Sequence, residues 1–155
     1  MSDHRAVISW RCNGPDFSKG RYSREHTWRF DGGVVVPASP SPSVVPSPYS
    51  NAANVDPEEA FVAAISSCHM LTFLHLASRA GFQIDSYDDE AVGVMTKNAA
   101  DAYWVSRVTL RPRIRCSGSL LPSVEDMRGL HRRAHEECFI ANSIKTEVVV
   151  DPVRE

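Results

Sequence analysis

A long uncharged segment near the middle of the chain limits the possible folds most strongly. Residues 60–78 contain no Asp, Glu, Lys or Arg, and a segment of this length can either cross a bilayer or form a helix that is buried nearly all round. Two His, three Ser and one Thr interrupt it, so we predict a buried helix in a soluble protein that does not associate with a membrane. Because one small monomer can hardly cover such a helix, we also expect a dimer.

The residues that flank this segment follow the rules for helix ends. Asp56 can cap the first turn, Pro57 suits the first helical position, and Glu59 can complete a capping box. Gly81 supplies the left-handed residue at which helices commonly end. The sequence therefore predicts a helix from Pro57 to about Ala80.

The rest of the chain predicts strands and one further helix. Ser123, with Asp126 three residues later, can cap a second helix that ends near Cys138. Segments that alternate, or that are rich in β-branched and aromatic residues, predict strands at residues 6–10, 26–30, 34–36, 83–96, 102–115 and 144–150. This order indicates an α+β fold with largely antiparallel strands, which we expect to form one domain over residues 1–155.

A proline-rich segment separates the first strands from the uncharged helix. The segment from Pro37 to Pro48 contains five prolines, including these two. Because proline removes a backbone donor and fixes φ, neither a helix nor a central strand can run through this segment. Residues 37–55 are therefore predicted to form a loop or extended arm within the domain. Such a segment is either a solvated connector or an arm that lines a pocket or wraps around a partner subunit.

Charge and cysteine content exclude several classes of protein. The formal net charge is -2, so the chain lacks the basic surface that binds nucleic acid. The N-terminal residues show no apolar block with a small-residue cleavage site, and we expect a cytoplasmic protein. Four scattered cysteines do not suit the disulfide framework of a small secreted domain, which leaves structural, metal-binding or redox-active thiols.

Two of the cysteines fall on the predicted helices. Cys68 shares the apolar face of the first helix with Phe61 and His75, where a thiol is either a small packed hydrophobe or a nucleophile. Cys138 ends the second helix just before a turn. If the two thiols meet, the pair can cycle between dithiol and disulfide through a sulfenic acid on Cys68.

A zinc site is the main alternative use of the second helix. His131, His135 and Cys138 are spaced i, i+4 and i+7, which points three ligand types to one side. The general-base Glu of an H-E-x-x-H helix and any CxxC pair are absent from the sequence. We therefore expect these residues to lie at the surface or at a helix end, and we expect no metal.

Charged residues near the first helix are further candidates. The cap accounts for Glu59 and leaves Glu58 free to hold an arginine, although Glu58 lies ~15 Å along the helix from Cys68. Arg21 and Arg24 are the arginines nearest the first hairpin. A guanidinium would favour a thiolate and bind a developing alkoxide, but exposed strand arginines are common, and these residues alone leave both interpretations open.

Two motifs in the chain resemble those of a known family. The first is the segment from Asp56 to Met70, DPEEAFVAAISSCHM, and the second is the sequence His135-Glu136-Glu137-Cys138 at the end of the second helix. Together they resemble the OsmC/Ohr family of osmotically inducible and organic hydroperoxide resistance proteins. The Ser-Ser-Cys-His-Met run and the segment 22–26, YSREH, place the chain nearer the OsmC-like branch than Ohr itself.

The resemblance implies an antioxidant oxidoreductase of the stress response that reduces organic hydroperoxides, and hydrogen peroxide less well, without a cofactor. It implies a peroxidatic Cys68, a resolving Cys138, and a Glu58 that pairs with the catalytic arginine. We favour Arg24 over Arg21 for that arginine. An external dithiol, such as a lipoylated protein, would reduce the disulfide.

The resemblance also implies an intertwined homodimer in which the cysteine helix is central and buried. Apolar neighbours such as Phe61 and Ile65 would then favour the alkyl tail of the substrate. The alternative function is a dimeric protein of the same fold that binds a small ligand without significant peroxidase activity, with Cys68 merely packed.

Overall fold

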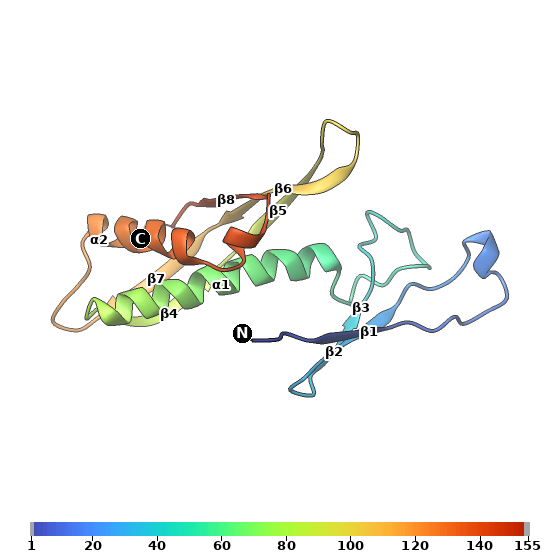
Figure 1. Cartoon of the computed structure of the whole chain (residues 1–155), viewed down its shortest axis with the longest axis horizontal. Helices are drawn as coiled ribbons and strands as arrows, with labels where there is room; N and C mark the ends of the chain where they lie inside the picture. Colours follow the sequence, from blue (N-terminus) through green and yellow to red (C-terminus); the bar gives the residue numbers. More distant parts are fainter. Residues whose placement is uncertain (1, 154–155) are drawn as a thin grey trace. The chain divides into compact units, whose positions relative to one another are not determined.

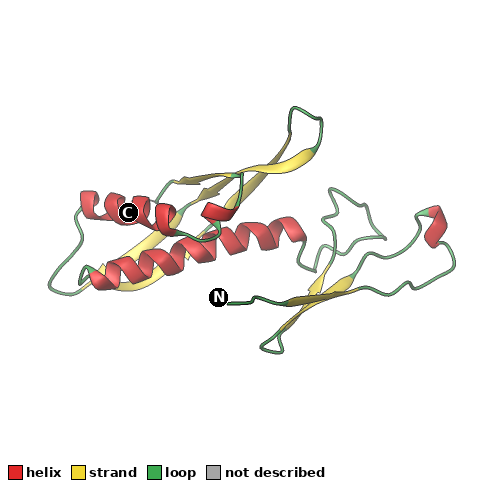
Figure 2. Cartoon of the chain, in the orientation of Figure 1, coloured by secondary structure: helices red, strands yellow, loops and turns green. Residues whose placement is uncertain are grey.

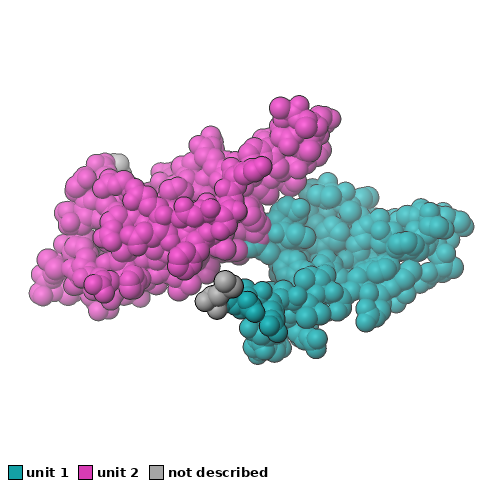
Figure 3. All heavy atoms as spheres, viewed as in Figure 1, with its two compact units in different colours: residues 1–60 teal, residues 61–155 magenta. Residues whose placement is uncertain are grey.

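In the computed structural model, which describes residues 2–153, the chain folds as two units, residues 1–60 and residues 61–155 (Figure 3). Two main helices and largely antiparallel strands make up the chain (Figure 2). The predicted α+β class is therefore confirmed. The organisation as one domain stays a prediction.

The first unit contains one antiparallel sheet of three strands in the order β1-β2-β3 (Figure 1). Its elements are β1 (Ala6–Ser9), the short 3-10 helix η1 (Phe17–Lys19), β2 (His26–Phe30) and β3 (Val35–Ala38). The proline-rich segment does not begin at Pro37 as predicted, because Pro37 lies within β3, opposite Thr27. An edge strand tolerates proline because one side of it needs no donors. Val55 then forms a bridge back to Ala38.

The second unit contains two sheets. One pairs β4 (Gln83–Asp89) with β7 (Pro112–Ser117), and the other has the order β5-β6-β8, formed by β5 (Val92–Lys97), β6 (Tyr103–Leu110) and β8 (Glu147–Val150). β6 and β8 run parallel, and the other pairs are antiparallel.

The segments 83–96 and 102–115, each predicted as one strand region, are each divided into two strands by a switch between these sheets. The switches lie at residues 90–91 and at Arg111. Asp89 joins the two places, because its Oδ1 accepts a hydrogen bond from the Arg111 N–H at 2.6 Å. Its Oδ2 accepts from the Ser66 hydroxyl at 2.5 Å. One carboxylate therefore ties both sheets to the first helix.

Helix α1 (Pro57–Arg79) begins as its sequence predicts. The Asp56 carboxylate accepts from the Glu59 N–H at 2.7 Å, and the Glu59 carboxylate accepts from the Asp56 N–H at 3.1 Å, which completes the capping box. At the other end, Gly81 has a φ of 83°, and the Phe82 N–H donates to the Ala77 carbonyl at 3.1 Å. This is the left-handed helix end that the sequence indicated.

Helix α2 (Val124–Glu137) also has the predicted cap. The Ser123 side chain accepts from the Asp126 N–H, and the Asp126 carboxylate accepts from the Ser123 N–H. Its buried Leu130 and Ala134 pack with Phe73, Leu76 and Ala77 of α1. A second cluster joins Ile65 of α1 to Val108 and Leu110 of β6.

One face of α1 stays exposed in the chain as described. Ala63, Ala64, Ser67 and Leu71 lie on it, and Leu71 is 60% exposed. By length and composition alone, α1 is long and apolar enough to cross a membrane. Its opposite face, however, packs on α2 and on the second unit's strands, as core helices of soluble proteins do. The exposed face is therefore an apolar surface without charged side chains.

Gly93 of β5 tests how closely α1 packs on its sheet. A Cβ at this position would lie 2.5 Å from Cγ2 of Val62, so Gly93→Ala should lower the free energy of unfolding by about 1–3 kcal/mol through overpacking. Gly32→Ala is the matched control, because no atom lies within 4 Å of its added methyl group. Urea denaturation measures both, and equal midpoints for the two variants would contradict this packing.

Candidate active site

The structure brings Cys68 and Cys138 together in the second unit. Both are free thiols, Cys68 half-buried on α1 and Cys138 fully buried at the end of α2. The Cys68 side chain lies close enough to Cys138 to raise the pKa of the Cys138 thiol. Since the two residues are 70 positions apart in the chain, it is the packing of α2 on α1 that creates this pair.

Backbone N–H groups from the turn after α2 point at both sulfurs. The Ile140 N–H donates to Sγ of Cys68 at 3.5 Å, and the Ala141 N–H donates to Sγ of Cys138 at 3.4 Å. The Asn142 amide holds this turn, because its Nδ2 donates to the carbonyls of Glu136 and Cys138 at 2.8 and 2.9 Å. Such donors stabilise negative charge on sulfur or on an oxygen bound to it.

The environment of Cys138 keeps its thiol protonated. Burial raises the pKa of Cys138 above its ordinary value, and interaction with the neighbouring Cys68 raises it further, although the N–H groups of Ala141 and Ile140 oppose this. A protonated thiol is a poor nucleophile. This environment suits a sulfur that reacts second.

Arg24 and Glu58 line one cavity of the first unit. The cavity has a volume of about 460 Å³, within the range of small-molecule sites. Trp10, Phe17 and Tyr22 also line it, and their rings contact one another with centroids 4.7–5.6 Å apart. The cavity thus combines an aromatic wall with one cation and one carboxylate.

Arg24 and Arg21 have different surroundings. The Arg24 guanidinium lies over the Tyr22 ring, 4.1 Å from its centroid, and donates to the Tyr22 carbonyl at 3.0 Å. Among residues 2–153, no ion pair joins it to Glu58. Arg21 instead pairs with Asp16 at 3.0 Å on the exposed surface. Of the two arginines, Arg24 is the one that lines the cavity, and both its catalytic role and its pairing with Glu58 stay predictions.

The two residues predicted to favour an alkyl tail lie at the start of α1. Ile65 is fully buried between Val108 and Leu110, and Phe61 packs at the edge of the same cluster. Their contribution to a substrate pocket stays a prediction. Sequence reasoning missed Trp10, Phe17 and Tyr22 as candidate site residues. Their closeness to Arg24 in the sequence is a signal that could have identified them.

A buried histidine pair joins α1 and α2, and one of its members, His69, follows Cys68 in the sequence. Nε2 of His69 and Nδ1 of His131 are 3.1 Å apart, and their rings are stacked. Burial lowers the pKa of each to about 4, so both are neutral near pH 7.

No cluster of three or more His, Cys, Asp or Glu side chains that could hold a metal ion occurs in the described part of the chain, so His131, His135 and Cys138 do not assemble the zinc site considered above.

The structure is thus an α+β fold in which the packing of the two main helices brings two free thiols together. A family model described as OsmC-like protein matches residues 50–153. The chain is also 49% identical to an OsmC-like protein of unknown function from Vibrio cholerae, with a TM-score of 0.96 over 99% of this chain and 100% of that one. The chain belongs to the OsmC-like family, as its motifs indicated.

More distant structures share the fold. An organic hydroperoxide resistance protein from Elizabethkingia anophelis, with thiocyanate bound, is 16% identical with a TM-score of 0.71 over 98% of this chain and 94% of that one. A putative organic hydroperoxide resistance protein from Vibrio cholerae, with captopril in one of its active sites, is 18% identical with a TM-score of 0.69 over 98% and 90%. No curated protein matches the chain.

Proposed function

We propose that this protein is a thiol-dependent peroxidase that reduces organic hydroperoxides with Cys68 and Cys138. The observation that carries the proposal is a neighbouring pair of free thiols, with a backbone N–H directed at each sulfur. Family membership supports a peroxidase-like role in the stress response, and two distant structural neighbours are named for organic hydroperoxide resistance.

The proposed reaction needs no cofactor. The Cys68 thiolate attacks the terminal oxygen of ROOH, the O–O bond breaks, and the alkoxide takes a proton to leave as ROH, which leaves a sulfenic acid on Cys68. The Cys138 sulfur then attacks this sulfenic sulfur, giving a disulfide and water. An external dithiol, such as a lipoylated protein, reduces the disulfide and is itself oxidised.

Each residue near the thiols has a proposed part in this reaction. The raised pKa of Cys138 keeps it from competing for the peroxide, and the Ile140 N–H favours negative charge at Cys68. Arg24 would favour the Cys68 thiolate and bind the departing oxygen, with Glu58, which lines the same cavity, as its proposed partner. The aromatic cavity of Trp10, Phe17 and Tyr22 would take the alkyl or aryl group of the substrate.

We also propose that the protein is a cytoplasmic homodimer. The exposed face of α1 supports this assembly, because it carries small residues and Leu71 along a helix that has no charged residue between Ala60 and Ser78. An uncharged helix face is rarely left in water. In a dimer, a partner subunit would cover it.

The peroxidase proposal predicts a loss of two thiols on oxidation. One equivalent of cumene hydroperoxide should lower the titratable thiols of the reduced protein from four by two, with a Cys68–Cys138 disulfide peptide in the mass spectrum. Cys138→Ser should instead stop at a Cys68 sulfenic acid that dimedone traps, while Cys116→Ser, a matched control in β7, should still form the disulfide. An unchanged thiol count would refute the peroxidase function.

Replacing Arg24 should slow the first step. Arg24→Gln is expected to lower the rate of Cys68 oxidation by cumene hydroperoxide about a hundredfold, and to shift the pH profile of that rate to higher pH, since the thiolate loses a cation. Arg21→Gln is the matched control, because Arg21 pairs with Asp16 at the surface. Stopped-flow measurement of both variants decides between the two arginines, and an equal loss in both would remove the special role of Arg24.

The dimer predicts an effect of charge on the exposed face of α1. Leu71→Glu should shift the sedimentation-equilibrium mass from twice the 17.2 kDa of one chain towards a single chain, because a buried carboxylate would stand in the interface. Leu121→Glu is the control, since Leu121 is similarly exposed, at 61% against 60%, but lies outside α1. A wild-type protein that sediments as a monomer would contradict the proposal.

A further inference from the structure

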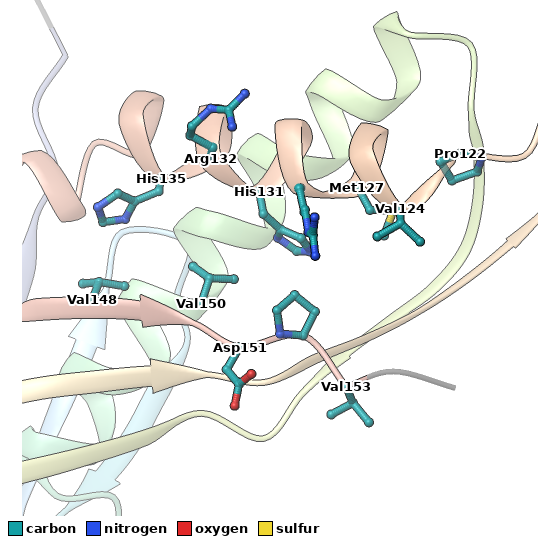
Figure 4. A pocket seen from close by; sticks show the side chains of 12 residues that line it. Pro122, Val124, Met127, His131, Arg132, His135, Val148, Val150, Asp151 and Val153 are labelled. Atoms are coloured by element: carbon teal, nitrogen blue, oxygen red, sulfur yellow. The ribbon is translucent and has the colours of Figure 1, made fainter.

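We propose that a cavity between α2 and β8 binds an organic carboxylate with a medium-length apolar tail. The cavity lies within the second unit and has a volume of about 560 Å³ (Figure 4). It is formed by residues other than the two thiols and the cavity of Arg24, so the proposal is independent of the peroxidase function.

Most of the cavity wall is apolar. Figure 4 shows Val148 and Val150 projecting from β8 towards α2, with Met127 and Val124 on the helix side and Val153 beyond the strand. A volume of this size falls within the ~300–1,000 Å³ of sites that enclose small organic molecules. The apolar part of the wall therefore suits an alkyl chain.

Basic side chains of α2 lie beside the apolar wall. Arg128, Arg132 and His135 line the cavity, and Asp151 is the one acidic residue among its lining residues. The Asp151 carboxylate points away from α2, whereas His135 projects towards β8 (Figure 4). Two arginines against one carboxylate give the lining a net positive charge, which complements an anionic head group rather than a neutral one.

His131 supplies a buried polar atom that lacks a partner. This side chain is only 5% exposed, it lines the cavity, and its Nε2 has no hydrogen-bond partner in the structure. Its Nδ1 is already engaged by Nε2 of His69 at 3.1 Å. A buried polar atom without a partner costs free energy, so a ligand that meets Nε2 gains the hydrogen bond that the protein leaves open.

The histidine pair can present the donor that a carboxylate needs. When the Nε2–H of His69 donates to Nδ1 of His131, the proton of His131 lies on its Nε2, in a ring that lines the cavity. Both rings are neutral near pH 7, because burial lowers the pKa of each to about 4. A carboxylate at Nε2 would therefore select one tautomer of the pair.

Binding of decanoate to the full-length reduced protein tests the site. Isothermal titration calorimetry at pH 7 should show one decanoate per chain, with decanol, which has the same tail without the charge, at least about tenfold weaker. Nitrogen-15 NMR of the imidazoles should show decanoate fixing His131 with its proton on Nε2. Cys68→Ser should bind decanoate as the wild type does, which separates this site from the thiols.

Two matched variants of α2 identify the cation. Arg128→Gln should weaken decanoate about threefold to tenfold, whereas Arg133→Gln should leave it within about twofold. The two arginines are comparable, because Arg128 pairs with Glu125 and Arg133 pairs with Glu137 at the surface, but only Arg128 lines the cavity.

Two results would each overturn the inference. The first is no binding of decanoate at about 1 mM; if Arg128→Gln also changes the sedimentation mass, this face is instead a contact between two copies of the chain. The second is equal weakening by Arg128→Gln and Arg133→Gln, which would indicate a general charge effect.

Discussion

The packing of α1 is the constraint on which the rest of the structure depends. A helix without a charged residue from Ala60 to Ser78 must cover its apolar surface. It does so on two sides, against α2 through Phe73 and Leu76 and against β6 through Ile65. The first contact sets the position of α2 and hence brings Cys138 to Cys68. The second holds α1 on the β5-β6-β8 sheet. Hydrophobic burial thus places the two thiols beside each other, although the thiols themselves are polar.

The two thiols are held in place by different kinds of interaction. Cys68 sits on a long helix fixed by packing, whereas Cys138 and the N–H groups of Ile140 and Ala141 lie on a short turn held by Asn142. Secondary structure positions one thiol, and a few hydrogen bonds position the other. The histidine pair lies between the two helices and links the thiol region to the cavity beside β8.

Local sequence signals predicted the helices well and the strands less well. The caps at Asp56 and Ser123 and the end at Gly81 depend on neighbouring residues alone, so they could be read directly. The division of residues 83–96 could not, because it depends on the contact of Asp89 with the distant Arg111. For the site, helix periodicity left Cys68 undecided, family motifs identified both cysteines, and the aromatic cavity around Arg24 required the fold.

The anchoring of Asp89 has a mechanical consequence for the proposed cycle. Its carboxylate holds Ser66, two residues before Cys68, and also holds the switch between the two sheets at Arg111. The turn of α1 that carries Cys68 is therefore fastened to the place where the chain passes from one sheet to the other. The end of α2 that carries Cys138 has no such anchor to both sheets among the contacts described above. In the proposed cycle, the movement that brings the two sulfurs to bonding distance would therefore fall on Cys138 and the last turn of α2.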